Sequence, residues 1–222
     1  DTSFAIGSGA NSLIEEVHLQ QDGKIVLGGS FVTFNGATCA SIIRLNTNGT
    51  IDTSFIQGTG FDGNVSALTS QADGKIIVGG AFVNYNGVLV NRIVRLNIDG
   101  SRDTTFNSGI GFSAGTVEVI KANALGTIIV GGSFSGTYNG TTVNRIVSLG
   151  SDGVLDAMFD IGAGPSTGSV YELKEDTTGS WYVGGSYSVF DSQNQGRLAK
   201  VDASGVLDIG YLASGVGFDN SV

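Results

Sequence analysis

The sequence predicts an all-β protein built from repeats, and three observations lead to this class. An Asp-x-x-aromatic motif recurs five times at intervals of 51–53 residues, starting at Asp1, Asp52, Asp103, Asp156 and Asp208. An apolar run followed by a Gly-Gly pair recurs with the same period. No stretch shows the 3.6-residue periodicity of a helix over three turns. A fixed period of this length is typical of a repeat architecture.

The second copy illustrates the expected order of elements within one period. Strands are expected where β-branched and aromatic residues alternate or cluster, and tight turns where Asp-Gly occurs. The expected elements are strands at 64–71, 75–82, 92–97 and 102–106, with turns at 72–74 and 99–100 and a loop at 84–90.

The second strand of each copy is predicted to be buried on both faces. Ile76-Ile77-Val78 is apolar without alternation, as in strands covered on both sides. Gly79-Gly80 follows, and paired glycines allow a neighbouring backbone to approach closely. Four-stranded antiparallel sheets that stack on one another at a ~50-residue period describe a β-propeller. A β-solenoid is the alternative, although its rungs are usually shorter.

The repeat boundaries predict one repeat domain over residues 1–222. Its parts are the repeats 1–51, 52–102, 103–155 and 156–207 and a partial repeat 208–222. The chain has five copies of the Asp-x-x-aromatic motif, which marks the fourth strand, but only four copies of the other three strands, so one fourth strand is surplus. After the last motif, Gly217-Phe218-Asp219 resembles Gly60-Phe61-Asp62, which precedes a first strand. Because exposed sheet edges invite pairing, we expect a segment of a longer array, or a ring completed by further repeats or a second copy of the chain.

The motif from Gln71 to Gly100, together with Asp103 and Phe106, resembles the delta-60 repeat. The resemblance covers the whole chain and weakens in the fourth copy, where Thr178-Gly179-Ser180 replaces Asp-Gly-Lys. It implies a β-propeller in large secreted or surface-exposed bacterial proteins or in phage proteins. The implied location is therefore extracellular, cell-surface or virion-associated. The family has no established catalytic residues, so the resemblance implies none here.

Composition excludes several classes of function. The net charge is −9 with only 11 Lys and Arg, which argues against nucleic-acid binding. No apolar run approaches the ~18–20 residues of a membrane span, so no membrane insertion is expected. Cys39 and His18 are single, which excludes zinc sites built from several such residues. We expect no cofactor and no metal site. Calcium at Asp99 and Asp103 is an alternative to the preferred turn-capping role.

The long loops are the expected binding face, because loop length and sequence vary there and loops on a rigid scaffold usually bind. An aromatic-Asn-Gly unit in these loops is suited to stacking and hydrogen bonding with a ligand. Its recurrence in three copies favours the alternative, in which the aromatic fills the gap between blades and Asn-Gly makes a turn. The expected ligand-binding residues are Phe34, Asn35, Tyr85, Asn86, Tyr138, Asn139, Phe190 and Asp191.

The predicted function is a non-catalytic scaffold or binding module for adhesion or receptor binding, for example in a phage tail, that contacts a protein or glycan surface. No catalytic residue is expected, because no reactive cluster is confined to one copy. The alternative is a carbohydrate-active enzyme, a glycoside hydrolase or lyase, that uses carboxylates near a central channel. The carboxylates available to it on or near first strands are Glu15, Glu16, Glu118, Glu172, Glu175 and Asp176.

Overall fold

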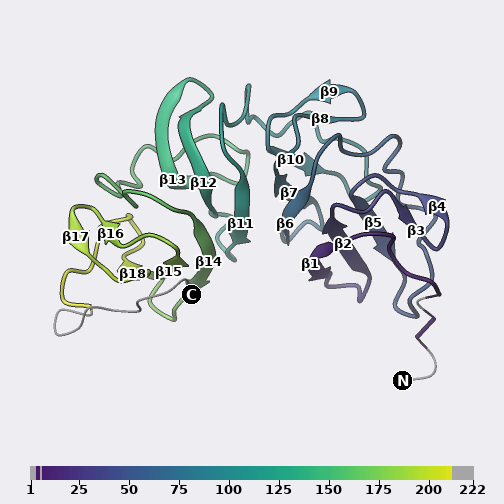
Figure 1. Ribbon diagram of the computed structural model, residues 1–222, viewed down its shortest axis with the longest axis horizontal. Coiled ribbons are helices and arrows are strands. Elements are labelled where there is room, and N and C mark those ends of the chain that lie inside the picture. Colours follow the sequence, from purple (N-terminus) through teal and green to yellow (C-terminus); the bar gives the residue numbers. More distant parts are fainter. Residues whose placement is uncertain (1–3, 6, 212–222) are drawn as a thin grey trace. The chain divides into compact units, whose positions relative to one another are not determined.

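The computed structural model describes residues 4–5 and 7–211, and every regular element within them is a β-strand (Figure 1). The all-β prediction is confirmed. The chain divides into two compact units, residues 1–111 and 112–222, and each unit contains two repeats. A search of the described residues found no helix with the length and apolar character needed to cross a membrane.

The first unit contains two copies of one three-stranded antiparallel sheet. We call each sheet, together with the short hairpin that extends from it, a blade, and the hairpin its arm. Blade 1 has the strand order β1 (Ile14–Leu19), β2 (Ile25–Gly29), β5 (Ile42–Leu45), with the arm β3 (Thr33–Phe34) and β4 (Ala37–Thr38). Blade 2 has the order β6 (Val65–Ser70), β7 (Ile76–Gly80), β10 (Ile93–Leu96), with the arm β8 (Asn84–Tyr85) and β9 (Val88–Leu89).

The second unit repeats this plan with one variation. Blade 3 consists of β11 (Val117–Ala122), β12 (Ile128–Tyr138) and β13 (Thr141–Leu149), and its arm is continuous with the two long strands. Blade 4 consists of β14 (Val170–Glu175), β15 (Trp181–Gly185) and β18 (Leu198–Val201), with the arm β16 (Val189–Phe190) and β17 (Gln193–Asn194). The first three strands expected from each repeat are therefore present, and the loop expected at 84–90 contains the arm.

The expected fourth strand is shorter than predicted. It joins its blade through one isolated bridge in each repeat, Leu45 with Ile51, Leu96 with Arg102, Leu149 with Leu155, and Val201 with Leu207. The following aspartate ends the pairing, because its carboxylate accepts hydrogen bonds from the backbone two residues later, as Asp52 Oδ1 does from Ser54 N at 3.0 Å. The surplus motif at Asp1 and the Gly217-Phe218-Asp219 segment lie outside the described residues, apart from Phe4.

The two glycines of each Gly-Gly pair have different structural roles. A Cβ on the second glycine would lie 2.0 Å from Asn64 O at Gly80 and 2.1 Å from Ser169 O at Gly185. This glycine lies opposite a bulge in the first strand, where the register shifts. In blades 1 and 3 a Cβ on the first glycine would instead meet the next blade, 2.5 Å from Val65 Cγ1 at Gly28 and 2.6 Å from Val170 Cγ1 at Gly131. The pair therefore permits both the bulge and close stacking of blades.

Stacked blades form the core within each unit, as the doubly apolar second strands predict. In the first unit Val26 and Ile42 of blade 1 pack with Leu68, Ile76 and Val78 of blade 2. In the second unit Ile129 and Ile146 of blade 3 pack in the same way on blade 4. This packing holds the tight turns at one end of each unit's blades and the arms at the other.

Candidate functional site

The aromatic rings expected to contact a ligand are buried. Their exposed fractions are 0% for Phe34, Tyr85 and Phe190 and 1% for Tyr138. Phe61 from the connection between blades packs against Tyr85 with ring centroids 4.5 Å apart. The rings offer no exposed face to a ligand, and their packing supports the structural role that the sequence left as the alternative.

The tyrosine hydroxyls also have internal partners. Tyr85 donates a hydrogen bond to Gly100 O and Tyr138 donates one to Gly153 O, both at 2.6 Å. Burial raises the pKa of both phenols above their ordinary range. Each hydroxyl thus ties the arm end of a blade's core to the turn after its third strand.

The polar residue after each aromatic fastens the arm to the preceding connection. Asn35 Oδ1 accepts a hydrogen bond from Gly9 N at 2.8 Å, and Asn86 Oδ1 accepts one from Gly60 N at 3.0 Å. In blade 4 Asp191 Oδ1 accepts from Ala163 N at 2.9 Å. Asn139 occupies this position in blade 3 with φ of 46°, a left-handed conformation that Asn tolerates better than most residues. Asn35 and Asn86 are exposed, but their side-chain oxygens are already engaged.

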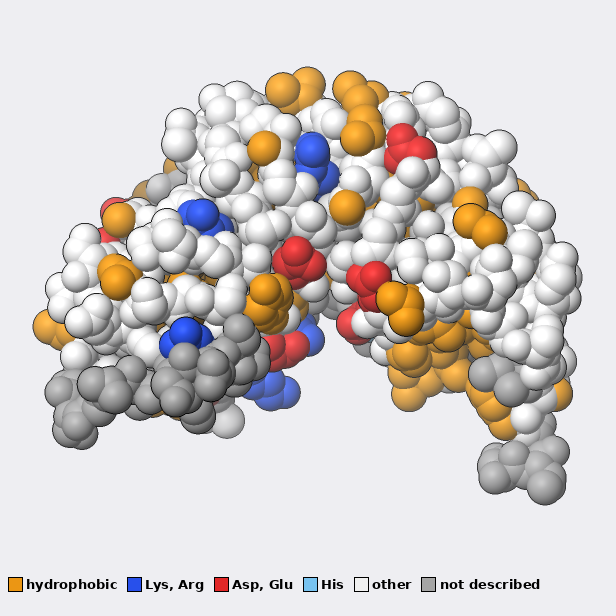
Figure 2. Space-filling view, in the orientation of Figure 1, with side chains coloured by type: hydrophobic (Ala, Val, Ile, Leu, Met, Phe, Trp, Pro, Cys, Tyr) orange, Lys and Arg blue, Asp and Glu red, His pale blue; other side chains and the backbone are white. Residues whose placement is uncertain are grey.

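Other side chains occupy the exposed surface at the arm end of blade 2. Val83, Val88, Leu89 and Ile110 have exposed fractions of 38%, 43%, 55% and 56%. Figure 2 shows hydrophobic side chains at the top of the view, over the region of the β8–β9 arm. These residues were not predicted from the sequence, because Val88, Leu89 and Ile110 belong to none of the repeated motifs.

The carboxylates of the enzyme alternative each have a partner. Asn64 Nδ2 donates to Glu15 Oε2 at 2.6 Å, and Asn123 Nδ2 donates to Glu175 Oε1 at 3.1 Å. Glu172 pairs with Lys121 at 3.1 Å, and Glu16 and Glu118 also have interactions. Hydrogen bonds from Thr178 and then Lys200 hold the pKa of Asp176 well below its usual range. A carboxyl held ionised in this way is a poor general acid.

The repeated aspartates are engaged in turns and ion pairs. Asp99 Oδ1 accepts from Ser101 N at 3.0 Å, and Asp103 Oδ1 accepts from Thr105 N at 2.9 Å. In the part of the chain that the structure describes, no group of three His, Cys, Asp or Glu side chains is arranged to hold a metal ion.

A buried ion pair joins the third strand to this aspartate in the first two blades. Arg44 Nε donates to Asp52 Oδ2, and Arg95 Nε donates to Asp103 Oδ2, both at 2.7 Å. Burial by itself would raise the pKa of Asp52, but hydrogen bonds from Lys24, Ser54 and Arg44 together hold it well below its usual range. This ion pair was not predicted from the sequence.

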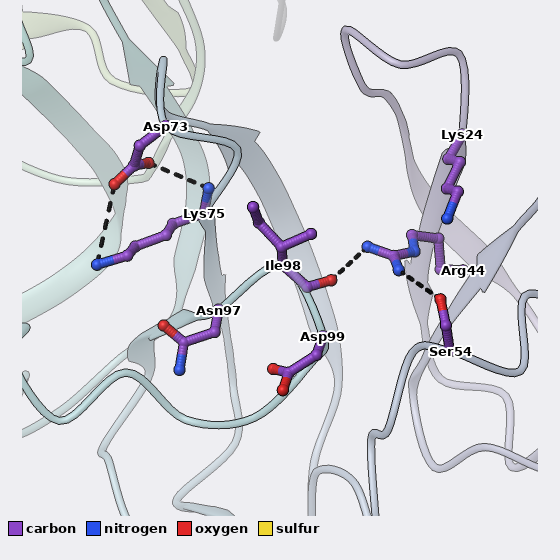
Figure 3. A pocket seen from close by; sticks show the side chains of 8 residues that line it. All are labelled: Lys24, Arg44, Ser54, Asp73, Lys75, Asn97, Ile98 and Asp99. Carbon is purple, nitrogen blue, oxygen red and sulfur yellow. Dashed lines mark hydrogen bonds and ion pairs between the residues drawn. The ribbon is translucent and has the colours of Figure 1, made fainter.

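The cavity in Figure 3 has a volume of about 520 Å³ and lies at the tight-turn end of the first unit. It is lined by Lys24, Arg44, Ser54, Asp73, Lys75, Asn97, Ile98 and Asp99. Its cations already have partners, since Lys24 pairs with Asp52 and Lys75 with Asp103, both at 2.9 Å. The cavity thus presents balanced charges at the end opposite to the long loops.

The repeated sheets, stacked face to face within each unit, define a protein of the β-propeller class. The sequence matches the family described as "Domain of unknown function (DUF5122) beta-propeller" over residues 20–55, 71–106, 126–159 and 177–209. The chain therefore belongs to this family, and the expectation of a β-propeller repeat family is confirmed. Each matched segment runs from the first hairpin turn to the Asp-x-x-aromatic motif of one repeat.

Two solved structures are similar to the chain. A protein of unknown function from Bacteroides caccae has 12% identity and a TM-score of 0.39, with 88% of this chain and 80% of that chain covered. The extracellular domain of the putative one-component system BT4673 from B. thetaiotaomicron has 14% identity and a TM-score of 0.28, with 86% and 30% covered. A search of curated proteins found no significant match.

Proposed function

We propose that this chain is a non-catalytic binding module and that its partner contacts the long-loop end of the blades. The observation that supports this most is the exposure of four apolar side chains: Val83, Val88 and Leu89, on or next to the β8–β9 arm, and Ile110, in the connection after blade 2. Contiguous exposed apolar patches, unlike single exposed apolar side chains, are typical of interaction sites.

The chemistry of this surface favours a protein partner over a glycan. Glycan recognition through stacking would need exposed aromatic faces, and the arm aromatics are enclosed in the core. Aliphatic side chains such as Val88 and Leu89 instead suit burial against a protein surface. The acidic composition and the resemblance to repeats of secreted, surface and phage proteins support an extracellular, cell-surface or virion-associated setting.

The absence of catalysis is also a proposal, and its support is the pairing of the first-strand carboxylates. Glycoside hydrolysis needs one carboxylic acid and one free carboxylate across a substrate. Glu15 and Glu175 accept hydrogen bonds from asparagines, and Glu172 pairs with a lysine. These contacts serve packing between first strands of adjacent blades.

The binding proposal is tested by screening protein and glycan ligands on immobilised chain. We expect Val88→Ser with Leu89→Ser to abolish binding of any protein ligand found. Leu125→Ser is the matched control, because Leu125 is an apolar side chain, 91% exposed, on the tight turn between β11 and β12 of the other unit. Glycan turnover that is lost in Glu172→Gln would contradict the proposal, as would protein binding that the double variant leaves intact.

We further propose that another blade, from additional repeats or a second copy of the chain, covers the outer face of blade 1. Val17 on this face is 61% exposed, whereas Leu68 at the same register in blade 2 is 4% exposed because blade 1 covers it. Leu19 beside it is 67% exposed, and Figure 2 shows a large hydrophobic area near β1.

Light scattering tests this second proposal. We expect the 222-residue chain to associate with increasing concentration and the variant Val17→Lys with Leu19→Lys to stay monomeric. Leu125→Lys should associate like the native chain. A native chain that remains a compact monomer at all concentrations would contradict the proposal.

A further inference from the structure

The third strands of the four blades carry different residues at one equivalent position. Arg44 pairs in register with Val26, Arg95 with Ile77, and Ser148 with Ile129. The fourth blade has Lys200 there, paired with Tyr182. The backbone beside this position is the same in blades 1 to 3, because the N–H of the following aspartate donates to its carbonyl at 2.9 Å in each.

In blades 1 and 2 the arginine side chain occupies a well-defined guanidinium site. Its Nε donates to the aspartate at 2.7 Å, and Cζ lies 4.8 Å from the ring centroid of Phe55 in blade 1 and 4.9 Å from that of Phe106 in blade 2. A lysine adds a second cation to the same carboxylate at 2.9 Å. The site therefore consists of a carboxylate edge next to an aromatic face, which is favourable for a guanidinium.

Blade 3 retains this site but lacks both cations. Ser148 replaces the arginine, Thr127 stands where Lys24 and Lys75 stand, and Asp156 and Phe159 remain. Asp156 Oδ1 accepts from Met158 N at 3.0 Å, as Asp52 Oδ1 does from Ser54 N, so the carboxylate keeps its orientation. Its Oδ2 has Ser148 Oγ at 3.4 Å in place of a guanidinium at 2.7 Å.

A cavity has opened where the arginine is missing. It has a volume of about 390 Å³, and Ser148, Asp156 and Phe159 lie in its wall together with Ile146 and Leu155. Asp156 and Phe159 are half-buried, whereas Asp52 is 6% and Phe55 4% exposed in blade 1. No Lys or Arg is among the residues that line the cavity, all of which the structure describes.

We propose that this blade 3 cavity binds the guanidinium group of a ligand, which takes the place that Arg44 and Arg95 fill in the first two blades. The guanidinium donates to Asp156 Oδ2 and lies over the Phe159 ring. The volume lies within the roughly 300–1,000 Å³ typical of ligand sites. The cavity wall extends to Thr141 and Thr142 of the blade 3 arm. The proposal rests on Ser148, Asp156 and Phe159 and does not depend on the binding-module proposal.

A guanidinium fits this site better than an alkylammonium does. In blades 1 and 2 the planar guanidinium contacts the carboxylate at its edge and the aromatic ring at one face. A compact ammonium group cannot make both contacts in this way. Two kinds of contact in the filled copies have no counterpart among the residues that line the blade 3 cavity. Met158 replaces Ser54 and Thr105, whose hydroxyls accept from the arginines at 3.3 and 3.2 Å. Arg44 Nη1 also donates to Ile98 O at 2.5 Å, and Arg95 Nη1 donates to Gln71 Oε1 at 2.8 Å.

Isothermal titration calorimetry with N-acetyl-L-arginine amide tests the proposal on the full chain. N-acetyl-L-citrulline amide is the matched probe, because its neutral ureido group has nearly the same shape. The peptide acetyl-Gly-Arg-Gly-amide distinguishes a site for an arginine within a polypeptide from one that accepts only the small molecule. We expect saturable binding of the arginine probe and no measurable binding of the citrulline probe.

Three variants locate the binding. Asp156→Asn keeps the turn and removes the charge, and should weaken binding about ten- to hundred-fold, as expected for loss of a charged hydrogen bond. Ser148→Arg restores the side chain of blades 1 and 2 and should abolish binding while the chain stays folded. Asp152→Asn, in an exposed turn of the same blade, should change affinity by less than about two-fold.

Several results would overturn the proposal. These are no saturable binding of the arginine probe, equal binding of the citrulline probe, or binding that Ser148→Arg leaves unchanged. If Asp156→Asn failed to fold, Ser148→Arg would still decide the question, because it keeps the carboxylate and fills the cavity from within.

Discussion

Neutralising the aspartate of the Asp-x-x-aromatic motif should have very different effects in different repeats. Asp52→Asn and Asp156→Asn make the same chemical change at equivalent positions. In both, the amide oxygen can still accept the backbone hydrogen bond two residues on, from Ser54 N or Met158 N. The comparison therefore isolates the charge on the second carboxylate oxygen.

The expected loss of unfolding free energy follows from how deeply each aspartate is buried and from the groups that contact its carboxylate. The Arg44 side chain is 2% exposed and that of Asp52 is 7% exposed, so Asp52→Asn leaves a guanidinium buried without its counter-ion. Breaking a buried pair typically costs about 3–5 kcal/mol. We expect about 3 kcal/mol, because the Lys24 side chain, 28% exposed, can turn to solvent. Asp156 loses only a long contact with Ser148, which should cost less than about 1 kcal/mol.

Urea denaturation at pH 7 measures both free energies of unfolding. The reasoning would be refuted by equal costs for the two variants, or by a larger cost for Asp156→Asn. Either result would mean that the motif stabilises the blade through its turn alone and that the ion pair with Arg44 adds nothing.

The same ion pair predicts a pH dependence with a definite sign. The pKa of Asp52 is depressed in the folded chain, so its stabilisation is fully present above the unfolded pKa of about 3.9 and is lost as the pH falls below it. The cost of Asp52→Asn should therefore be largest at neutral pH and shrink below about pH 4. A cost that is constant from pH 7 to pH 3 would contradict this reasoning.

Three further predictions concern single side chains. Gly131→Ala should destabilise the chain strongly, because the added Cβ would lie 2.6 Å from Val170 Cγ1 of the next blade. Gly184→Ala should be nearly neutral, since the atoms nearest to its added Cβ are 3.9 Å away. Thermal melts of the two variants compare their effects. Tyr85→Phe leaves a buried carbonyl unpaired and should cost about 1–3 kcal/mol in urea denaturation. Burial raises the pKa of the Cys39 thiol to about 11, so a disulfide reagent at pH 8 should modify it only after denaturant is added.

Much of the fold could be predicted because the residues that specify each strand and turn recur in every repeat. The apolar run Ile76-Ile77-Val78 predicted a strand covered on both faces, and β7 is buried along its whole length. The Asp73-Gly74 turn and the strands around it were also predicted correctly, since tight hairpins leave few alternative registers. The Gly-Gly pair indicated close approach, although only the structure separates the bulge from the blade contact.

The fourth strand was overestimated because Asp103-Thr104-Thr105-Phe106 looks like a strand by propensity. The Asp103 carboxylate instead accepts hydrogen bonds from the backbone N–H and the hydroxyl of Thr105, which folds the segment into a turn after one bridge. A β-propensity scale cannot weigh this local competition against the ladder.

The candidate site was harder to predict, because a repeated aromatic in a loop can bind a ligand or fill the core. Burial decides between these roles at Tyr85, and burial depends on the connection that brings Phe61 over the ring. The proposed guanidinium site in blade 3 arises from a residue that differs between the repeats. Arg44 and Ser148 could be compared in the sequence, but their contact with the aspartate eight residues later became visible only in the folded blade.

The thermal stability of Tyr85→Ala tests most directly the claim that the aromatic-Asn-Gly units build the scaffold and that exposed loop residues are free to bind. Tyr85 is 0% exposed and Leu89, two residues past the arm turn, is 55% exposed. Removing a buried aromatic costs about 3–5 kcal/mol, so we expect Tyr85→Ala to lower the melting temperature strongly or prevent folding. Leu89→Ala should leave the melting temperature unchanged. Native-like melting of Tyr85→Ala would contradict the account and return the aromatic rings to the ligand-binding face.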